Sequence, residues 1–133
     1  MSKVINNNGF NTKLKDDQFL RIVENSTMGV AIIQRGFLKY CNPRFQATFG
    51  YSHEEIASWK KFEYFKIIHP DDVPLLLEKM KIEDRKNVSV RFRGVKKNGD
   101  IINIENYICR IKYKDKFGYL SSYIMLDNSL KSG

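Results

Sequence analysis

The sequence predicts an α+β domain built on a five-stranded antiparallel sheet with short helices on one face. The first observation is a strand meander over residues 87–127, in which apolar and polar side chains alternate. The second is an apolar hairpin pattern over residues 28–41, and the third is a series of short amphipathic segments between these two regions. Because such short helices are unstable alone, their apolar faces must close over the sheet.

Residues 13–27 are predicted to form an amphipathic helix that follows a flexible lead-in over residues 1–12. Phe19, Ile22 and Val23 recur at helical spacing, so they form an apolar stripe that needs a surface to cover. The lead-in is rich in Asn and poor in apolar residues, which is typical of an unpacked terminus.

Two apolar runs, Met28–Gln34 and Phe37–Cys41, are separated by Arg35-Gly36. This pattern predicts a β-hairpin with the glycine at its corner. Pro43 then ends the second strand, since a proline suits the first turn of a helix.

Short helices are predicted between the strand regions. The first carries Phe45 and Phe49 one helical turn apart and is ended by Gly50. The second is opened by a capping box of Ser52 and Glu55, in which each side chain accepts a backbone N–H of the other residue. Its apolar residues are Ile56 and Trp59, and a third short helix over residues 60–66 carries Phe62 and Phe65.

The last helix of this series is predicted to start with Asp71 or Asp72 as its N-cap, a role that explains the acidic pair better than a catalytic dyad does. It continues to Lys86. Its apolar stripe consists of Val73, Leu76, Leu77 and Met80.

Turn signals divide the meander into three strands. Asn98-Gly99 predicts a turn with positive φ at both residues, because Gly lacks a Cβ and Asn tolerates the left-handed region. A second turn over residues 114–118 leads to a third strand, Tyr119–Leu126.

Composition indicates one cytoplasmic domain. The chain has 133 residues, a size that supports a single core, and no apolar run long enough to cross a membrane. Cys41 and Cys109 lie in predicted strands without metal-ligand spacing, so we expect buried, reduced thiols.

The net charge of +8 is concentrated between Lys79 and Lys116, where 12 Lys or Arg face 5 Asp or Glu. Two interpretations are open, a solvated basic face and a phosphate-binding surface. No helix-turn-helix, zinc or RNA-binding motif accompanies the charge, which argues against nucleic acid as a partner.

Strand alternation separates the side chains under the helices from those on the opposite face, and it places Ile108 under the helices. Asn106 also falls there. An unpaired buried amide costs on the order of 1–3 kcal/mol, so Asn106 either bonds a backbone group of the helical layer or orients a ligand. Tyr123 is a second candidate polar group. The candidate ligand-pocket residues are Phe45, Phe49, Ile56, Phe65, Leu76, Met80, Phe92, Ile104, Asn106, Tyr123 and Met125.

The opposite face of the last strand is also apolar and needs a cover, because that face of an antiparallel sheet otherwise meets water. The stripe of the N-terminal helix is the natural cover. The predicted flanking-helix and dimer face therefore consists of Phe19, Ile22, Val23, Leu120, Ile124 and Leu126.

Four motifs resemble those of PAS domains in their order and spacing. The first lies in residues 42–56 and runs from N-P-R-F through F-G-Y-S to E-I, and the second is I-H-P-D-D in residues 68–72. The third is R-x-x-x-K-x-G in residues 93–99. The fourth is L-D-N-S in residues 126–129, where the family usually has Ile in place of Asn. The resemblance covers roughly residues 16–129. It implies the strand order 2-1-5-4-3 and, where there is a ligand, a site between helices and sheet.

The resemblance also bears on cofactors. The flavin-binding photoreceptor branch of the PAS family carries a reactive Cys in the helix that matches Trp59–Ile68. This chain has no Cys there, so flavin adduct chemistry is not expected. Haem-binding members carry a His on the long helix or the helix before it. Here the long helix offers Met80 and no His, and His69 matches a structural turn residue, so haem is not expected. No catalytic triad, Cys-His pair, carboxylate dyad or metal site can be assembled.

The function implied by the resemblance is that of a non-catalytic, cytoplasmic sensory module. Residues 28–129 would be the PAS core, and residues 130–133 would begin a linker to an output domain such as a histidine kinase or a cyclic-nucleotide enzyme. A small apolar or aromatic ligand, or homodimerisation, would shift the last strands, and Asp127 and Ser129 would relay the change. The alternative is a ligand-free interaction and dimerisation module with a filled core. Nucleic-acid binding through residues 79–116 is the third hypothesis.

Overall fold

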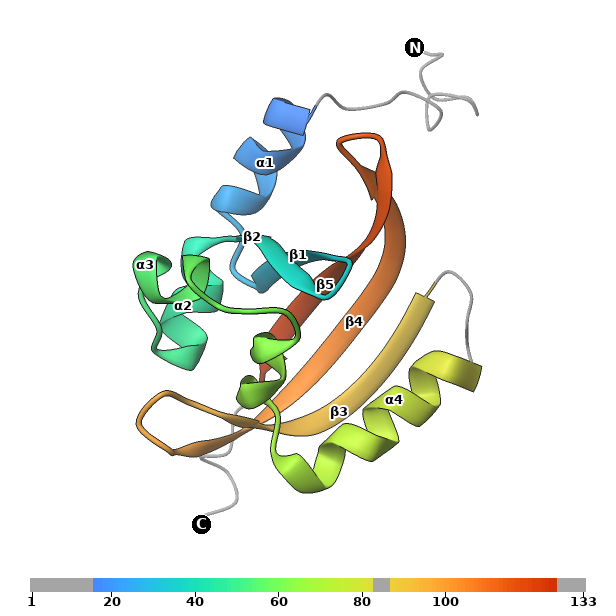
Figure 1. Ribbon diagram of the computed structural model, residues 1–133. Helices are drawn as coiled ribbons and strands as arrows, with labels where there is room; N and C mark the ends of the chain where they lie inside the picture. The colour runs from blue at the N-terminus through green and yellow to red at the C-terminus, as the bar shows by residue number, and fades with distance from the viewer. Residues whose placement is uncertain (1–15, 83–86, 127–133) are drawn as a thin grey trace.

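The computed structural model describes residues 16–82 and 87–126. It contains one five-stranded antiparallel sheet in the order β2-β1-β5-β4-β3 (Figure 1). The strands are β1 (Gly29–Gln34), β2 (Phe37–Cys41), β3 (Asn87–Val95), β4 (Ile101–Tyr113) and β5 (Lys116–Met125). The predicted fold class and strand order are confirmed.

The β4–β5 hairpin is tighter than predicted. Lys114 and Asp115 both have positive φ, 53° and 66°, so two residues make the whole turn. The backbone twist of such a turn matches that of the flanking strands, and pairing therefore resumes at once. As a result β5 begins at Lys116, ahead of the predicted start at Tyr119.

The β3–β4 turn corrects a second expectation. Only Gly99 has a positive φ there, 94°, so the predicted positive φ at Asn98 is wrong. The Gly99 N–H donates to the Lys96 carbonyl at 2.8 Å, and the Asp100 N–H donates to Asn98 Oδ1 at 2.9 Å. Asn98 thus stabilises the turn with its side chain instead of adopting the left-handed region.

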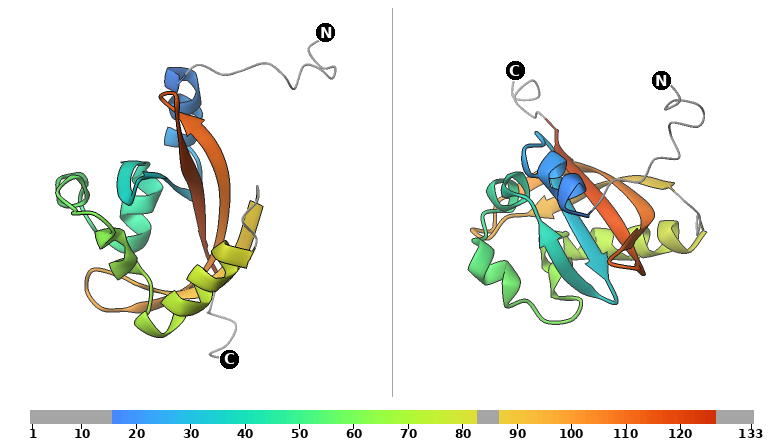
Figure 2. Two further views of the ribbon diagram at one scale, coloured as in Figure 1. Left: turned by 45° about the vertical axis from the view of Figure 1, so that its right-hand side comes forward. Right: turned by 90° about the horizontal axis from the view of Figure 1, so that it is seen from above.

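Short helices cover one face of the sheet, which we call the inner face (Figure 2). In chain order they are α2 (Pro43–Phe49), α3 (His53–Ala57), the 3-10 helices η2 (Glu63–Ile67) and η3 (Pro70–Asp72), and α4 (Val73–Ile82). The predicted capping box is present, with Glu55 N–H donating to Ser52 Oγ and Ser52 N–H donating to Glu55 Oε1. Gly50 ends α2 in the left-handed conformation, as predicted.

Asn42 fixes α2 to the sheet. It is fully buried, and its Oδ1 accepts from the N–H groups of Val30 and Phe45 at 2.9 and 3.0 Å. Its Nδ2 donates to the carbonyls of Val23 and Met28 at 2.8 and 2.9 Å. One amide therefore joins the end of the flanking helix, the start of β1 and the first turn of α2.

The acidic pair does not cap α4 as predicted. The N–H of Asp71 donates to Nδ1 of His69, which is the N-cap of η3. The Asp72 carboxylate accepts from the Arg93 backbone N–H, Nε and Nη2 at 2.7, 3.1 and 2.7 Å, and these bonds lower the pKa of Asp72 to about 2. The partner lies on β3, so local sequence could not reveal it.

The opposite, outer face is covered in part by α1 (Asp16–Glu24). Val23 and Ile32 are 9% and 0% exposed, and the Tyr40 hydroxyl on β2 donates to Glu24. Ile22, by contrast, is 61% exposed. The predicted segments 1–12 and 130–133, and the start of the predicted flanking helix, lie outside the described residues.

Candidate functional site

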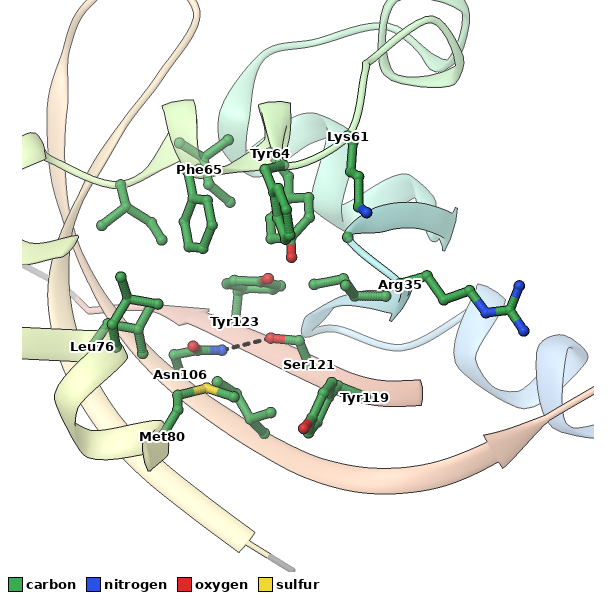
Figure 3. Close-up of a pocket in the computed structure, with 17 residues that line it drawn as sticks. Arg35, Lys61, Tyr64, Phe65, Leu76, Met80, Asn106, Tyr119, Ser121 and Tyr123 are labelled. Atoms are coloured by element: carbon green, nitrogen blue, oxygen red, sulfur yellow. Dashed lines mark hydrogen bonds between the residues drawn. The ribbon is translucent and has the colours of Figure 1, made fainter. Parts of the chain in front are cut away.

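A cavity of about 610 Å³ lies between the inner face of the sheet and the helical layer. Side chains of β4 and β5 form its floor, η2 and α4 form its cover, and the β1–β2 turn borders one end (Figure 3). Sites for small molecules typically have volumes of roughly 300–1,000 Å³. The cavity is therefore large enough for such a molecule.

The floor places polar groups in the middle of an apolar surface. Asn106 on β4 pairs with Tyr123 on β5, and Ile108 pairs with Ser121. Paired residues of a sheet point to the same side, so these four side chains face the cavity together. Tyr119 lies further along β5 on the same face.

Asn106 is 2% exposed, and its Nδ2 donates to Ser121 Oγ and to the Ser122 carbonyl, each at 2.9 Å (Figure 3). Both partners belong to β5, so the amide nitrogen ties two strands together and does not reach the helical layer. Within residues 16–82 and 87–126, Asn106 Oδ1 accepts no hydrogen bond. A buried acceptor of this kind is suited to a ligand donor.

Three tyrosines contribute hydroxyl groups to the cavity wall, Tyr119 and Tyr123 from the floor and Tyr64 from η2. Burial raises the pKa of Tyr123 and of Tyr64 above the usual value of a phenol. These two phenols therefore stay protonated at neutral pH and can donate a hydrogen bond. Tyr64 points from the cover toward the floor (Figure 3).

The cover over the cavity packs less closely than the floor. Phe62, which precedes η2, has a φ of 64°, a strained value for an aromatic residue, and is 51% exposed. Its ring stacks on Phe65 with 6.1 Å between centroids, and its N–H donates to the Gly36 carbonyl at 2.6 Å. From α4, Leu76 is buried, whereas Leu77 lines the rim and is 50% exposed.

Two cations border the cavity where η2 meets the β1–β2 turn, and we call this end the mouth. They are Arg35 and Lys61, and among the described residues no Asp or Glu lines the cavity. A Cβ at Gly36 would lie 2.8 Å from Lys61 Cγ and from Phe62 Cε1, so only glycine permits this close contact of turn and cover.

The arrangement is suited to binding, and the described residues that line it include no Cys, His, Asp or Glu. Cys41 is buried in the core, where burial raises its pKa to about 11, and Cys109 is half-buried on the outer face. Neither thiol lines the cavity. In the described part of the chain, no three His, Cys, Asp or Glu side chains are grouped to hold a metal ion. No described helix is long and apolar enough to span a membrane.

Comparison with known families is consistent with this geometry. The family model for the PAS fold matches residues 38–119, more than half of the chain. The chain belongs to the PAS family. No curated protein is significantly similar to this PAS domain. Domains of this family are generally sensory and not catalytic.

Solved structures show the same fold at low identity. A PAS domain from Colwellia psychrerythraea has a TM-score of 0.70 at 17% identity, and the match covers 83% of this chain and 95% of that chain. The PAS domain of nitrogen regulation protein NR(II) from Vibrio parahaemolyticus has a TM-score of 0.63 at 18% identity, with 86% and 100% coverage. A PAS domain from a two-component sensor histidine kinase has a TM-score of 0.64 at 15% identity, with 80% and 91% coverage.

The structure divides the eleven candidate pocket residues of this PAS domain into three groups. Five line the cavity: Phe65, Leu76, Met80, Asn106 and Tyr123. Five others are buried in the solid core beside it: Phe45, Phe49, Ile56, Phe92 and Ile104. Met125 is on the inner face but is 54% exposed and does not line the cavity, so its placement in the pocket is corrected.

The predicted outer-face residues are also placed. Leu120 and Ile124 lie on the outer side of β5, and with Leu126 and Phe19 they are partly buried. Val23 is buried and Ile22 is exposed. The predicted relay residues Asp127 and Ser129 lie outside the described residues.

Several cavity residues were missed from the sequence. Alternation from Tyr123 would have found Ser121 and Tyr119, because all three are on one face of β5. Ile33 on β1 follows from the same rule. Arg35 and Lys61 had no such signal, since their position depends on how the cover meets the turn.

Proposed function

We propose that this PAS domain is a sensory module of a larger cytoplasmic signalling protein, such as a histidine kinase, and that it responds to a small, largely apolar ligand. The observation that carries the proposal is the cavity of about 610 Å³ with Asn106 Oδ1, Tyr64 and Tyr123 as convergent polar groups. Similarity to the PAS domains of a two-component sensor histidine kinase and of a nitrogen regulation protein supports the signalling context.

The proposed signal leaves through β5. Ser121 and Tyr123 line the cavity, and β5 ends at Met125, just before the predicted relay residues. Asn106 links β4 to β5 through two hydrogen bonds. A ligand that engages the Asn106 amide would favour one arrangement of this strand pair and would thereby shift the segment that contains Asp127 and Ser129.

Native mass spectrometry with an absorbance scan of the gently purified domain tests for a ligand. We expect a bound species in the wild type and weaker retention of it in Met80→Trp, because a larger side chain at this half-buried position takes up part of the cavity. Leu75→Trp is the matched control, since Leu75 is on the same helix, is 61% exposed and lies away from the cavity. A wild-type domain without ligand that no small molecule stabilises against heat would contradict the proposal.

The second candidate is a ligand-free interaction module that forms homodimers through α1 and the outer sheet face. The 61% exposure of Ile22 beside the buried Val23 favours it. Sedimentation of Ile22→Gln tests this face, and Leu75→Gln is a control with equal exposure on another surface. A dimer weakened only by Ile22→Gln would support the interface, whereas an unchanged dimer or a wild-type monomer would exclude it.

The excess of basic residues in the sequence favours nucleic-acid binding more than their arrangement in the structure does. Three cations of the basic region 79–116 pair with carboxylates: Arg93 with Asp72, Lys97 with Glu55, and Arg91 with Glu105. These pairs reduce the charge that the region offers to phosphates.

A further inference from the structure

The charges around the cavity are unevenly distributed. Its interior polar groups are neutral, namely Asn106, Ser121 and Tyr123, and its only charged lining residues in the described part of the chain are Arg35 and Lys61 at the mouth. Within residues 16–82 and 87–126, neither cation forms an ion pair. Lys61 extends from the cover toward the β1–β2 turn that carries Arg35 (Figure 3).

A second, shallower hollow continues the mouth along the inner face. It has a volume of about 260 Å³ and shares Arg35 and Tyr119 with the main cavity. Arg110 and Phe117 complete it, and the Arg110 guanidinium lies 5.7 Å from the centre of the Phe117 ring. The positive charge therefore extends outward from the mouth and not into the cavity.

From this distribution we infer that the ligand is an amphiphilic anion. Its apolar chain or ring occupies the cavity, and its acid group lies at the mouth next to Lys61, on the side of the β1–β2 turn that carries Arg35. An anion inside the cavity would lose its hydration without a cationic partner, whereas at the mouth it meets Lys61, lies on the side of Arg35 and remains in contact with water. The inference rests on the proposed function and adds the class and the orientation of the ligand.

Titration calorimetry with three probes of one chain length tests the inference. The probes are decanoate, decanol and decylammonium, each used at neutral pH below its aggregation concentration. We expect decanoate to bind about tenfold more tightly than decanol and decylammonium to bind most weakly. Raising the salt concentration is expected to weaken the binding of decanoate more than that of decanol, because the ion pairs at the mouth are open to water.

Charge-removing variants locate the acid group. Lys61→Gln and Arg35→Gln should each weaken decanoate binding about fivefold, as for partly exposed ion pairs, and leave decanol unchanged. Lys60→Gln is the matched control, because Lys60 is the chain neighbour of Lys61 but does not line the cavity. Binding of phosphatidylglycerol vesicles that depends on Lys61 and is blocked by Met80→Trp would support the anionic head and assign its source to a bilayer.

The outcomes separate this inference from the proposed function. If decanoate and decanol bind equally, or if Lys61→Gln and Arg35→Gln leave decanoate unchanged, the anionic head is excluded while an apolar ligand stands. If no probe binds and no small molecule stabilises the domain, the proposed function and the inference both fail. Met80→Trp should weaken binding of all three probes, and unchanged affinities would place them outside the cavity.

Discussion

The inner face of the sheet has two halves that are covered differently. Under α2, the rings of Phe45 and Phe49 lie 5.0 Å apart and are both 0% exposed, and each packs against the ring of Tyr123, which also borders the cavity. Under η2 and α4, half-buried side chains such as Phe65 and Met80 leave about 610 Å³ empty. Both halves are apolar, so hydrophobicity alone does not distinguish a core from a cavity.

The difference lies in where the cover is attached. In the filled half, Gly29 lets the backbone approach, since a Cβ there would lie 3.1 Å from Phe45 Cα, and Asn42 bonds the helix to the sheet from inside. In the open half the cover is attached at its start, where the Phe62 N–H donates to Gly36, and between η2 and α4, where Ile68 bridges Gly94 and Asp72 bonds Arg93. None of these attachments is a buried side-chain amide like that of Asn42, and the cavity lies beside this part of the cover.

The largest expected effect is that of Phe45→Ala in the filled half. Removing a fully buried ring should lower the free energy of unfolding by about 3–5 kcal/mol, because transfer and cavity terms add. Phe65→Ala in the open half should lower it by about 1–2 kcal/mol, since that ring is partly exposed and already borders empty space. Urea denaturation measures both, and equal losses would remove the distinction between the halves.

Asn42→Ala comes next and tests the internal attachment. It removes four hydrogen bonds at a fully buried position and takes a partner from backbone groups of α1, β1 and α2, so we expect a loss of about 2–3 kcal/mol. Asn98→Ala, in the exposed β3–β4 turn, should change stability by no more than about 0.5 kcal/mol. A small loss for Asn42→Ala would show that the filled half is held by ring packing alone.

This dependence on attachment explains how much of the molecule the sequence could predict. The sheet, its order and the caps at Ser52 and Gly50 depend on alternation, turn residues and motifs that lie close together in the chain. Local sequence predicts that Asp72 is a helix cap. In the structure Asp72 instead forms an ion pair with Arg93, which lies on a different element. Likewise, the bonds of Asn42 to Val23 and Val30 have no local signal.

The candidate site shows the same limit. Face assignment placed Asn106 and Tyr123 correctly on the inner face, but it could not tell them from Ile104 or Phe92, which share that face and are buried in solid core. Which side chains border the cavity depends on the distance between the helical cover and the sheet. The residue pattern of a single strand does not predict that distance. The cations at the mouth were missed for the same reason.

Substitution by larger side chains should also distinguish the two halves, because the filled half has no room for added atoms and the open half does. Ala31→Leu inserts atoms where Ala31 is 0% exposed in the filled core, and it should destabilise the domain by about 1–3 kcal/mol. Met80→Trp adds volume beside the cavity, so the ligand-free domain should change by less than about 1 kcal/mol. Thermal unfolding of ligand-free samples measures both, and a severe loss for Met80→Trp would indicate that the open half is already filled.

The smallest expected effect concerns the attachment of the open half by Asp72 and Arg93. Asp72→Asn should cost about 1 kcal/mol at neutral pH, since Arg93 is 45% exposed and water screens the pair. The folded-state pKa of Asp72 is lowered to about 2, so the contribution is present above the unfolded carboxyl pKa of about 3.9 and is lost as the pH falls through about 2.

The stability difference between wild type and Asp72→Asn should therefore be constant from about pH 5 to 7 and shrink between about pH 4 and 2. Asp71→Asn is the control for loss of a neighbouring carboxylate, because Asp71 is exposed and makes no hydrogen bond to Arg93, and it should change stability less than Asp72→Asn at neutral pH. If the difference persisted at pH 2, Asp72 would act through packing and not through its charge. The cover would then be held at Asp72 by packing, as α2 is in the filled half. The two halves would no longer differ in how their helices are attached to the sheet.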